Sequence, residues 1–162
     1  MNELPEVLVI KEQADKLLDG KKVAKVLPPT KKHGFAWFNV PPENYDAMMR
    51  GKVFSHSDAY GMYLELDFDG VKLVVHDGVN VRFLEAGEKL PKDYQLMIVF
   101  DDASVLCFTV AMYGGFMCFE GTHSDPYYDR NKFGVHALFD SFDEMHLRQM
   151  ISALKPNKSV KE

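Results

Sequence analysis

The chain has 162 residues, of which 24 are acidic and 19 are basic, so its formal net charge is −5. This balance argues against a strongly basic surface for nucleic acids, and 46% hydrophobic content argues against a disordered chain. No apolar run approaches the roughly 20 residues that cross a bilayer, so we expect a cytoplasmic globular protein with no membrane partner. The lysines that gather at residues 21–32 are explained by a solvated loop or strand edge.

Two helices are predicted in the first third of the chain. Residues 5–18 carry apolar side chains at helical spacing, and Pro5 suits a first helical turn because its missing N–H costs nothing there. Residues 42–50 repeat the arrangement over a shorter length, beginning with Pro42 and followed by Gly51.

Most of the chain from residue 21 to residue 120 reads as β-structure. Asp69-Gly70 lies between two alternating runs, which is the strongest short-range signal for a hairpin, and residues 101–104 form a second predicted turn. Together with four further runs, at residues 21–28, 33–40, 52–58 and 78–85, these predict about eight short strands. The expected fold is mainly β with flanking helices, in the form of an antiparallel β-sandwich.

The amino-acid composition of the sequence changes after residue 120. Residues 121–134 are rich in Asp, Asn, Gly and Pro and are interpreted as a linker, with a domain boundary at residue 130. A helix is predicted at residues 143–154, with Asp143 as its N-cap and Pro156 after its end. We expect its apolar stripe to pack on the sandwich or on helices that this chain does not contain.

The histidines and cysteines show no metal-ligand spacing, so no metal site is predicted. Cys107 and Cys118 lie in strand-like surroundings and are interpreted as reduced core thiols.

Read in order, the motifs resemble the formamidopyrimidine-DNA glycosylase and endonuclease VIII family of base-excision repair enzymes. The tetrapeptide Glu3-Leu4-Pro5-Glu6 matches the opening of that family. Further matches are Asp19-Gly20, Arg50-Gly51-Lys52-Val53, Gly61 with Tyr63-Leu64-Glu65-Leu66, and His76 two residues before Gly78. The resemblance implies residues 1–130 as the family's N-terminal β-sandwich domain and residues 131–162 as the start of its helix-two-turns-helix domain.

The resemblance also implies a catalytic apparatus at the N-terminus. In the family an N-terminal proline, exposed when methionine is removed, attacks the sugar of a damaged nucleotide and forms a Schiff base. Asn2 occupies that position, while Glu3 matches the glutamate that serves as acid and base, with Glu6 close behind it. If Met1 is retained, the free amine is displaced by one residue; if Met1 is removed, Asn2 offers a primary amine.

The same alignment implies positions that contact DNA, and most of them are substituted. Met62 stands where the family has a phosphate-binding lysine, and His76 keeps the place of a phosphate-contacting histidine. The three residues that fill the gap left by an extruded nucleotide correspond to Val79, Met112 and Gly114. The family implies a zinc finger and further helices in a longer protein, whereas no cofactor is expected in residues 1–162.

Two functions follow from these matches. The first is a DNA glycosylase and abasic-site lyase for oxidised bases, divergent and impaired in catalysis. The second is a non-catalytic DNA-binding or scaffolding module that keeps the glycosylase fold. Both functions predict a monomer that binds damaged or abasic double-stranded DNA, and weak binding for a chain of this length. In a bacterium, both predict that the protein associates with the nucleoid.

Overall fold

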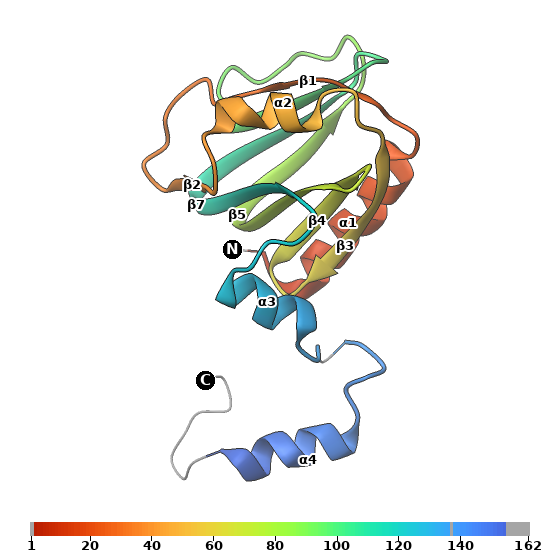
Figure 1. Ribbon diagram of the computed structural model, residues 1–162, viewed down its shortest axis with the longest axis vertical. Helices are drawn as coiled ribbons and strands as arrows, with labels where there is room; N and C mark the ends of the chain where they lie inside the picture. Colours follow the sequence, from red (N-terminus) through yellow and green to blue (C-terminus); the bar gives the residue numbers. More distant parts are fainter. Residues whose placement is uncertain (1, 137, 155–162) are drawn as a thin grey trace.

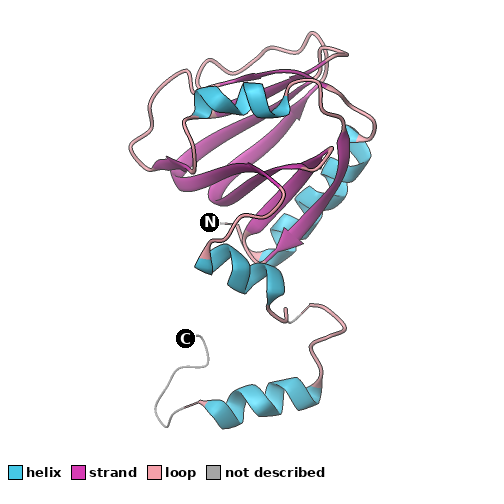
Figure 2. Cartoon of the chain, viewed as in Figure 1, coloured by secondary structure: helices cyan, strands magenta, loops and turns pink. Residues whose placement is uncertain are grey.

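The computed structural model describes residues 2–136 and 138–154, and it is dominated by one mainly antiparallel sheet (Figures 1 and 2). The strands are β1 (Val23–Leu27), β2 (Ala36–Phe38), β3 (Phe54–Tyr60), β4 (Tyr63–Phe68), β5 (Val71–Leu84), β6 (Leu96–Phe100) and β7 (Val105–Glu120). The helices are α1 (Leu4–Leu18), η1 (Pro42–Asn44, a 3₁₀ turn), α2 (Tyr45–Met49), α3 (Pro126–Phe133) and α4 (Glu144–Ala153). The predicted mainly β fold with flanking helices is confirmed.

The sheet has the strand order β1-β6-β7-β5-β4-β3, and β2 pairs in parallel with β7. It contains seven strands because β5 runs continuously through two segments predicted as separate strands. A bulge between Asp77 and Val79 marks the place where the two segments join. The predicted hairpin turn is present: Asp69 and Gly70 have φ angles of +49° and +81°.

The long strands β5 and β7 create the two layers. The first part of β5 pairs with β4, whereas the first part of β7 pairs with β6. The sheet therefore folds over near the β5 bulge, as Figure 1 shows. Its two halves enclose an apolar core. Leu66 of β4 and Ile98 of β6, both fully buried, belong to that core.

Helix α1 packs on β3 and β4 through its buried residues Val7, Ala14 and Leu18. The carboxylate of Asp15 accepts hydrogen bonds from the N–H and the hydroxyl of Ser57 in β3, at 2.8 and 2.6 Å. The helix therefore has a fixed position on the sheet, which also fixes the direction of the residues that precede it.

The prediction of a linker at residues 121–134 is wrong, because residues 126–133 form α3. The carboxylate of Asp125 caps this helix by accepting hydrogen bonds from the backbone N–H groups of Tyr127 and Tyr128, at 3.0 and 2.9 Å. Pro126 takes the first helical position, where no hydrogen bond is lost. Because α3 runs across residues 130 and 131, the domain boundary proposed there lies within a helix and stays a prediction.

Helix α3 is anchored to the sheet by Glu65, whose side chain is only 1% exposed. Its carboxylate accepts hydrogen bonds from Lys72, from Lys132 at 2.8 Å and from the hydroxyl of Tyr128. Burial alone would raise the pKa of Glu65, but the hydrogen bonds from Lys132, Lys72 and Tyr128 outweigh it and lower the pKa below 4.5. Glu65 is therefore a buried anion held by two cations.

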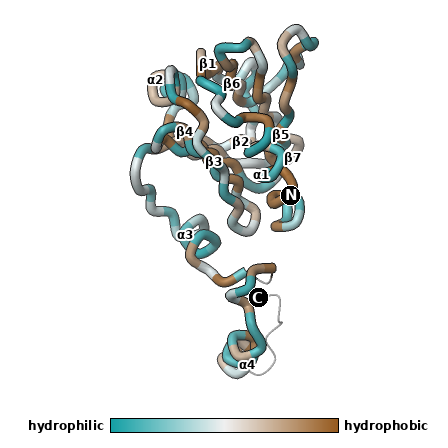
Figure 3. The backbone as a smooth tube through the Cα atoms, turned by 90° about the vertical axis from the view of Figure 1, so that its right-hand side faces the viewer, coloured by the Kyte–Doolittle hydropathy of each residue, from teal (hydrophilic) through white to brown (hydrophobic). Residues whose placement is uncertain are grey.

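The predicted C-terminal helix is present as α4, and its cap is confirmed: Asp143 accepts a hydrogen bond from the N–H of His146 at 2.7 Å. Figures 1 and 3 both place α4 away from the sheet, so its apolar stripe does not pack on the sandwich. The exposed side chains are Met145, Leu147, Met150 and Ile151. The rest of the predicted C-terminal segment, residues 155–162, lies outside the described residues.

Both cysteines are buried in β7, in agreement with the prediction of core thiols. Burial raises the pKa of Cys107 to about 11 and that of Cys118 to about 12. The helices found in residues 2–136 and 138–154 all lack the length and apolar character that a membrane crossing requires.

Candidate functional site

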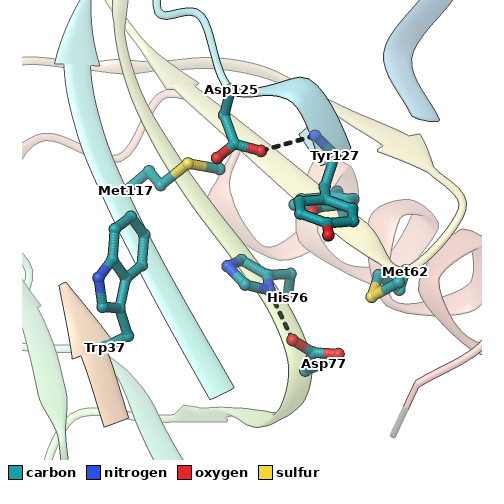
Figure 4. Close-up of a pocket in the computed structure, with 8 residues that line it drawn as sticks. Trp37, Met62, His76, Asp77, Met117, Asp125 and Tyr127 are labelled. Atoms are coloured by element: carbon teal, nitrogen blue, oxygen red, sulfur yellow. Dashed lines mark hydrogen bonds and ion pairs between the residues drawn. The ribbon is translucent and has the colours of Figure 1, made fainter. Parts of the chain in front are cut away.

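A pocket of about 360 Å³ lies where β2, β4, β5, β7 and the start of α3 meet (Figure 4). It is lined by Trp37, Met62, Tyr63, His76, Asp77, Met117, Asp125 and Tyr127. Its size is that of a small-molecule site, and aromatic rings and thioethers make up much of its wall.

His76 lies in the middle of this lining, just before the β5 bulge. Its Nδ1 lies 2.9 Å from a carboxylate oxygen of Asp77. Because a carboxylate only accepts hydrogen bonds, Nδ1 carries the proton, and Nε2 is the nitrogen left for another partner. Asp77 has a φ angle of +60°, a conformation that Asp tolerates better than most residues.

Neighbouring residues hold the His76 ring in place. The ring of Tyr63 lies 4.8 Å from it between centroids, and that of Trp37 lies 6.4 Å away. Gly115 of β7 is directly opposite His76 in the sheet, and a Cβ atom on this glycine would overlap the imidazole. The absence of a side chain at residue 115 is therefore what gives His76 its space.

The pocket carries negative charge. Its lining contains the carboxylates of Asp77 and Asp125 but no lysine or arginine. Burial, followed by the negative charges of Asp125 and Asp77, raises the pKa of Tyr63 to about 12. The same field acts on any ligand that enters, because a charge in a partly buried site is only weakly screened by solvent.

Asn2 is hydrogen-bonded to Asp77, a residue of the pocket lining. The backbone N–H of Asn2 donates a hydrogen bond to the carbonyl oxygen of Asp77 at 2.9 Å, and the Asn2 side-chain amide donates to the carbonyl of Val79 at 3.0 Å. The bulge of β5 thus holds Asn2 from both sides. The structure brings together four of the predicted site residues: Asn2, Met62, His76 and Val79.

The two glutamates of the opening tetrapeptide lie at the start of α1. The carboxylate of Glu6 accepts a hydrogen bond from the backbone N–H of Glu3 at 2.6 Å, and the Glu3 carbonyl accepts from the N–H of Glu6. Both side chains are exposed, and neither lines the pocket. Their observed contacts are those of a helix start.

Three predicted DNA-contact positions, Val79, Met112 and Gly114, lie outside the pocket lining. Met112 is 71% exposed on β7, whereas Gly114 is buried opposite Asp77. A Cβ atom on Gly114 would lie 2.6 Å from a methyl group of Val79, which is itself 1% exposed. Of these three positions, only Met112 presents a side chain that a partner can reach.

Four residues of the pocket lining were not predicted from the sequence as site residues: Trp37, Asp77, Asp125 and Tyr127. Asp77 lies between His76 and Gly78, which both match the family motif. An acidic side chain next to a histidine could have indicated that Asp77 belongs to the site. Trp37 gave no such signal, because only the parallel pairing of β2 with β7 brings it to the pocket.

Groups of three or more His, Cys, Asp or Glu side chains able to hold a metal are absent from the described part of the chain. The expectation that residues 1–162 hold no cofactor is not tested by this observation and stays a prediction.

Comparison with known proteins gives a family match. The model of the formamidopyrimidine-DNA glycosylase N-terminal domain matches residues 1–117. The formamidopyrimidine-DNA glycosylase of Pelobacter propionicus is 34% identical over 110 residues, which are 67% of this chain and 40% of that protein. The Streptococcus thermophilus protein of the same name is 25% identical over 169 residues, covering 99% of this chain and 58% of its own length. The chain thus spans roughly half the length of these relatives.

Solved structures show the same fold. The Lactococcus lactis Fpg in complex with DNA containing an abasic site superposes with a TM-score of 0.77, over 94% of this chain and 57% of that one. A complex of the same protein non-covalently bound to DNA containing an AP site gives a TM-score of 0.73. Sequence identity is 20% in both cases, so the likeness shows the fold alone.

Proposed function

The chain belongs to the formamidopyrimidine-DNA glycosylase family, and from that premise we propose that it acts in base-excision repair as a divergent member. On this proposal it binds damaged or abasic duplex DNA as a monomer, and its excision and lyase chemistry is impaired.

The observation that carries the proposal is the state of Asn2. The family reaction needs an N-terminal amine with a free lone pair, and it uses the secondary amine of proline. Here the nitrogen of Asn2 donates a hydrogen bond to Asp77, and with Met1 in place it is an amide nitrogen without nucleophilic character. Glu3 then has no amine to assist, and its role as acid and base is lost.

The residues at the predicted DNA-contact positions give a second reason to propose impaired chemistry. A phosphate beside the lesion needs cations or N–H donors, and Met62 offers neither. At the positions that would fill the vacancy of an extruded base, Val79 is buried and Gly114 has no side chain. Met112 is the one exposed apolar side chain among them, and it is suited to wedge between bases.

A second candidate is a non-catalytic DNA-binding or scaffolding module with this fold. The hydrogen bonds of Asn2 favour it, because they give the N-terminal residue a structural role at the β5 bulge that needs no chemistry. Both candidates share DNA as the partner and differ in whether a covalent intermediate forms.

Intact mass of the purified protein, measured with and without borohydride in the presence of an abasic duplex, separates the two. For the proposed divergent enzyme we expect a small adduct peak that grows when Met1 is absent. No adduct in either form supports the non-catalytic module. An adduct in most molecules, with Met1 removed, would overturn the proposal of impaired chemistry.

A further inference from the structure

We infer that the pocket around His76 binds a flat organic cation, of the class of an N-alkylated nucleobase, and that it does not bind phosphate. The assignment rests on the proposed function only for the source of the ligand, which is a damaged base in DNA. The chemistry of the pocket itself is argued from its walls, its charges and its hydrogen bonds.

Aromatic side chains in the walls of the pocket offer the faces of their rings to a ligand. Trp37 is 51% exposed and Tyr127 is 71% exposed, and Figure 4 shows the two rings on either side of His76. The ring of Tyr63 lies 4.8 Å from the imidazole between centroids. A planar ring that carries a positive charge is attracted to such faces by stacking and by the cation–π interaction together. The thioethers of Met62 and Met117 adapt to the outline of a ring.

The charges favour a cation. One oxygen of Asp77 is engaged by His76, and one oxygen of Asp125 accepts the two hydrogen bonds that cap α3. Among the described residues, the second oxygen of each carboxylate accepts no hydrogen bond, so it can receive one from an amino group of a ligand. Two carboxylates facing one small volume make a negative potential that stabilises a bound positive charge.

The same arrangement excludes an anion. The N–H groups at the start of α3, which are an anion site in many proteins, already donate to Asp125. The nearest lysines on α3 and β5, Lys132 and Lys72, donate to Glu65 and do not line the pocket. A phosphate entering here meets two carboxylates, and the lining has no lysine or arginine to compensate them.

The experiment uses Trp37 as its reporter, because it is the only tryptophan of the chain. Its fluorescence, excited at the red edge where nucleosides do not absorb, is titrated with N1-methyladenosine, adenosine and inorganic phosphate at neutral pH. N1-methyladenosine is a cation there and adenosine is not, so the pair differs by one methyl group and one charge. We expect at least tenfold tighter binding of the methylated nucleoside and no response to phosphate.

Two variants test the carboxylates. Asp77→Asn keeps a side chain of the same shape beside His76, and Asp125→Asn keeps a good helix cap. Each is expected to reduce the preference for N1-methyladenosine over adenosine at least threefold. The control Asp93→Asn, at an exposed residue that does not line the pocket, leaves it unchanged. Circular dichroism confirms that the variants stay folded. Equal binding of both nucleosides, binding of phosphate, or an unchanged preference in both variants overturns the assignment.

Two duplexes distinguish this assignment from the proposed function. One carries a single N1-methyladenine, and the other carries adenine at the same place. Tighter binding of the methylated duplex supports a base in DNA as the source. If the free nucleoside shows the charge preference and neither duplex binds, the proposed function fails and the pocket assignment stands. If both duplexes bind equally and the nucleosides show no preference, the assignment fails and DNA binding stands.

Discussion

The backbone N–H of Asn2 donates a hydrogen bond to the carbonyl oxygen of Asp77 at 2.9 Å, and the side chain of the same Asp77 holds His76. One residue of the β5 bulge therefore connects Asn2 to the imidazole of the pocket. This hydrogen bond fixes the backbone nitrogen of Asn2 beside the bulge of β5.

Restoring the amine should restore the first chemical step. In the variant Asn2→Pro with verified removal of Met1, the N-terminal residue is a secondary amine at the rim of the pocket. We expect borohydride trapping on abasic duplex DNA to rise at least tenfold over the unmodified chain, and further with Met62→Lys, because that lysine supplies a phosphate contact.

Glu3→Gln in the Asn2→Pro background tests the neighbouring carboxylate. If Glu3 still serves as acid and base, strand cleavage falls at least tenfold in this variant. If Glu3 is only part of the helix start, cleavage is unchanged. Trapping by unmodified protein at the level of the proline variant would contradict the first expectation.

Removing the charge of Glu65 should destabilise the fold. Glu65→Gln leaves Lys72 and Lys132 without their anion in a largely buried site, which typically costs about 3 kcal/mol. Urea unfolding followed by circular dichroism measures the difference. The exposed Glu120→Gln is the matched control, and it should change the free energy of unfolding by less than about 0.5 kcal/mol.

The pH dependence of stability should follow the same carboxylate. Its pKa is lowered below 4.5 in the folded chain, so its contribution is complete above 4.5, the ordinary value of an unfolded glutamate, and is lost as pH falls through the folded pKa. We expect the free energy of unfolding to decrease on acidification below this value. The decrease should be smaller in Glu65→Gln, and identical curves for the two proteins would contradict the role of Glu65.

Gly115→Ala should displace His76 without unfolding the chain. The added methyl group overlaps the imidazole, which is held between Gly115 and Tyr63, so the ring must rotate. We expect large changes in the NMR signals of His76 and in the fluorescence of Trp37. Gly34→Ala is the control, since a Cβ atom there meets nothing within 4 Å. Unchanged signals in Gly115→Ala would show that the ring does not lie against this glycine.

Local signals in the sequence predicted the parts of the fold that depend on neighbours along the chain. The turn at Asp69-Gly70 and the cap at Asp143 are both fixed by residues within four positions, and both are present. Asp125-Pro126 carried a signal of the same kind, but the Gly- and Asn-rich surroundings hid it, and α3 was missed.

The other features that the sequence did not predict depend on pairing between strands that are distant along the chain. Whether β5 ends or continues at Gly78 depends on its partner: a Cβ atom there would lie 2.7 Å from the carbonyl oxygen of Tyr113 in β7. The placement of Trp37 beside His76 likewise depends on a parallel pairing with β7 that no local pattern encodes. The predicted His76 and Met62 do lie in one pocket, but its aromatic and acidic character comes from residues distant in sequence.

DNA binding by residues 1–162 should be weak and nonspecific. The net charge is −5, the pocket lining holds two carboxylates and no lysine or arginine, and Val79 and Gly114 offer no wedge to a base stack. In a fluorescence titration at moderate salt we expect dissociation constants in the micromolar range or weaker, for abasic and undamaged duplexes alike. Submicromolar binding with a clear preference for the abasic duplex would show that the substituted positions still support recognition.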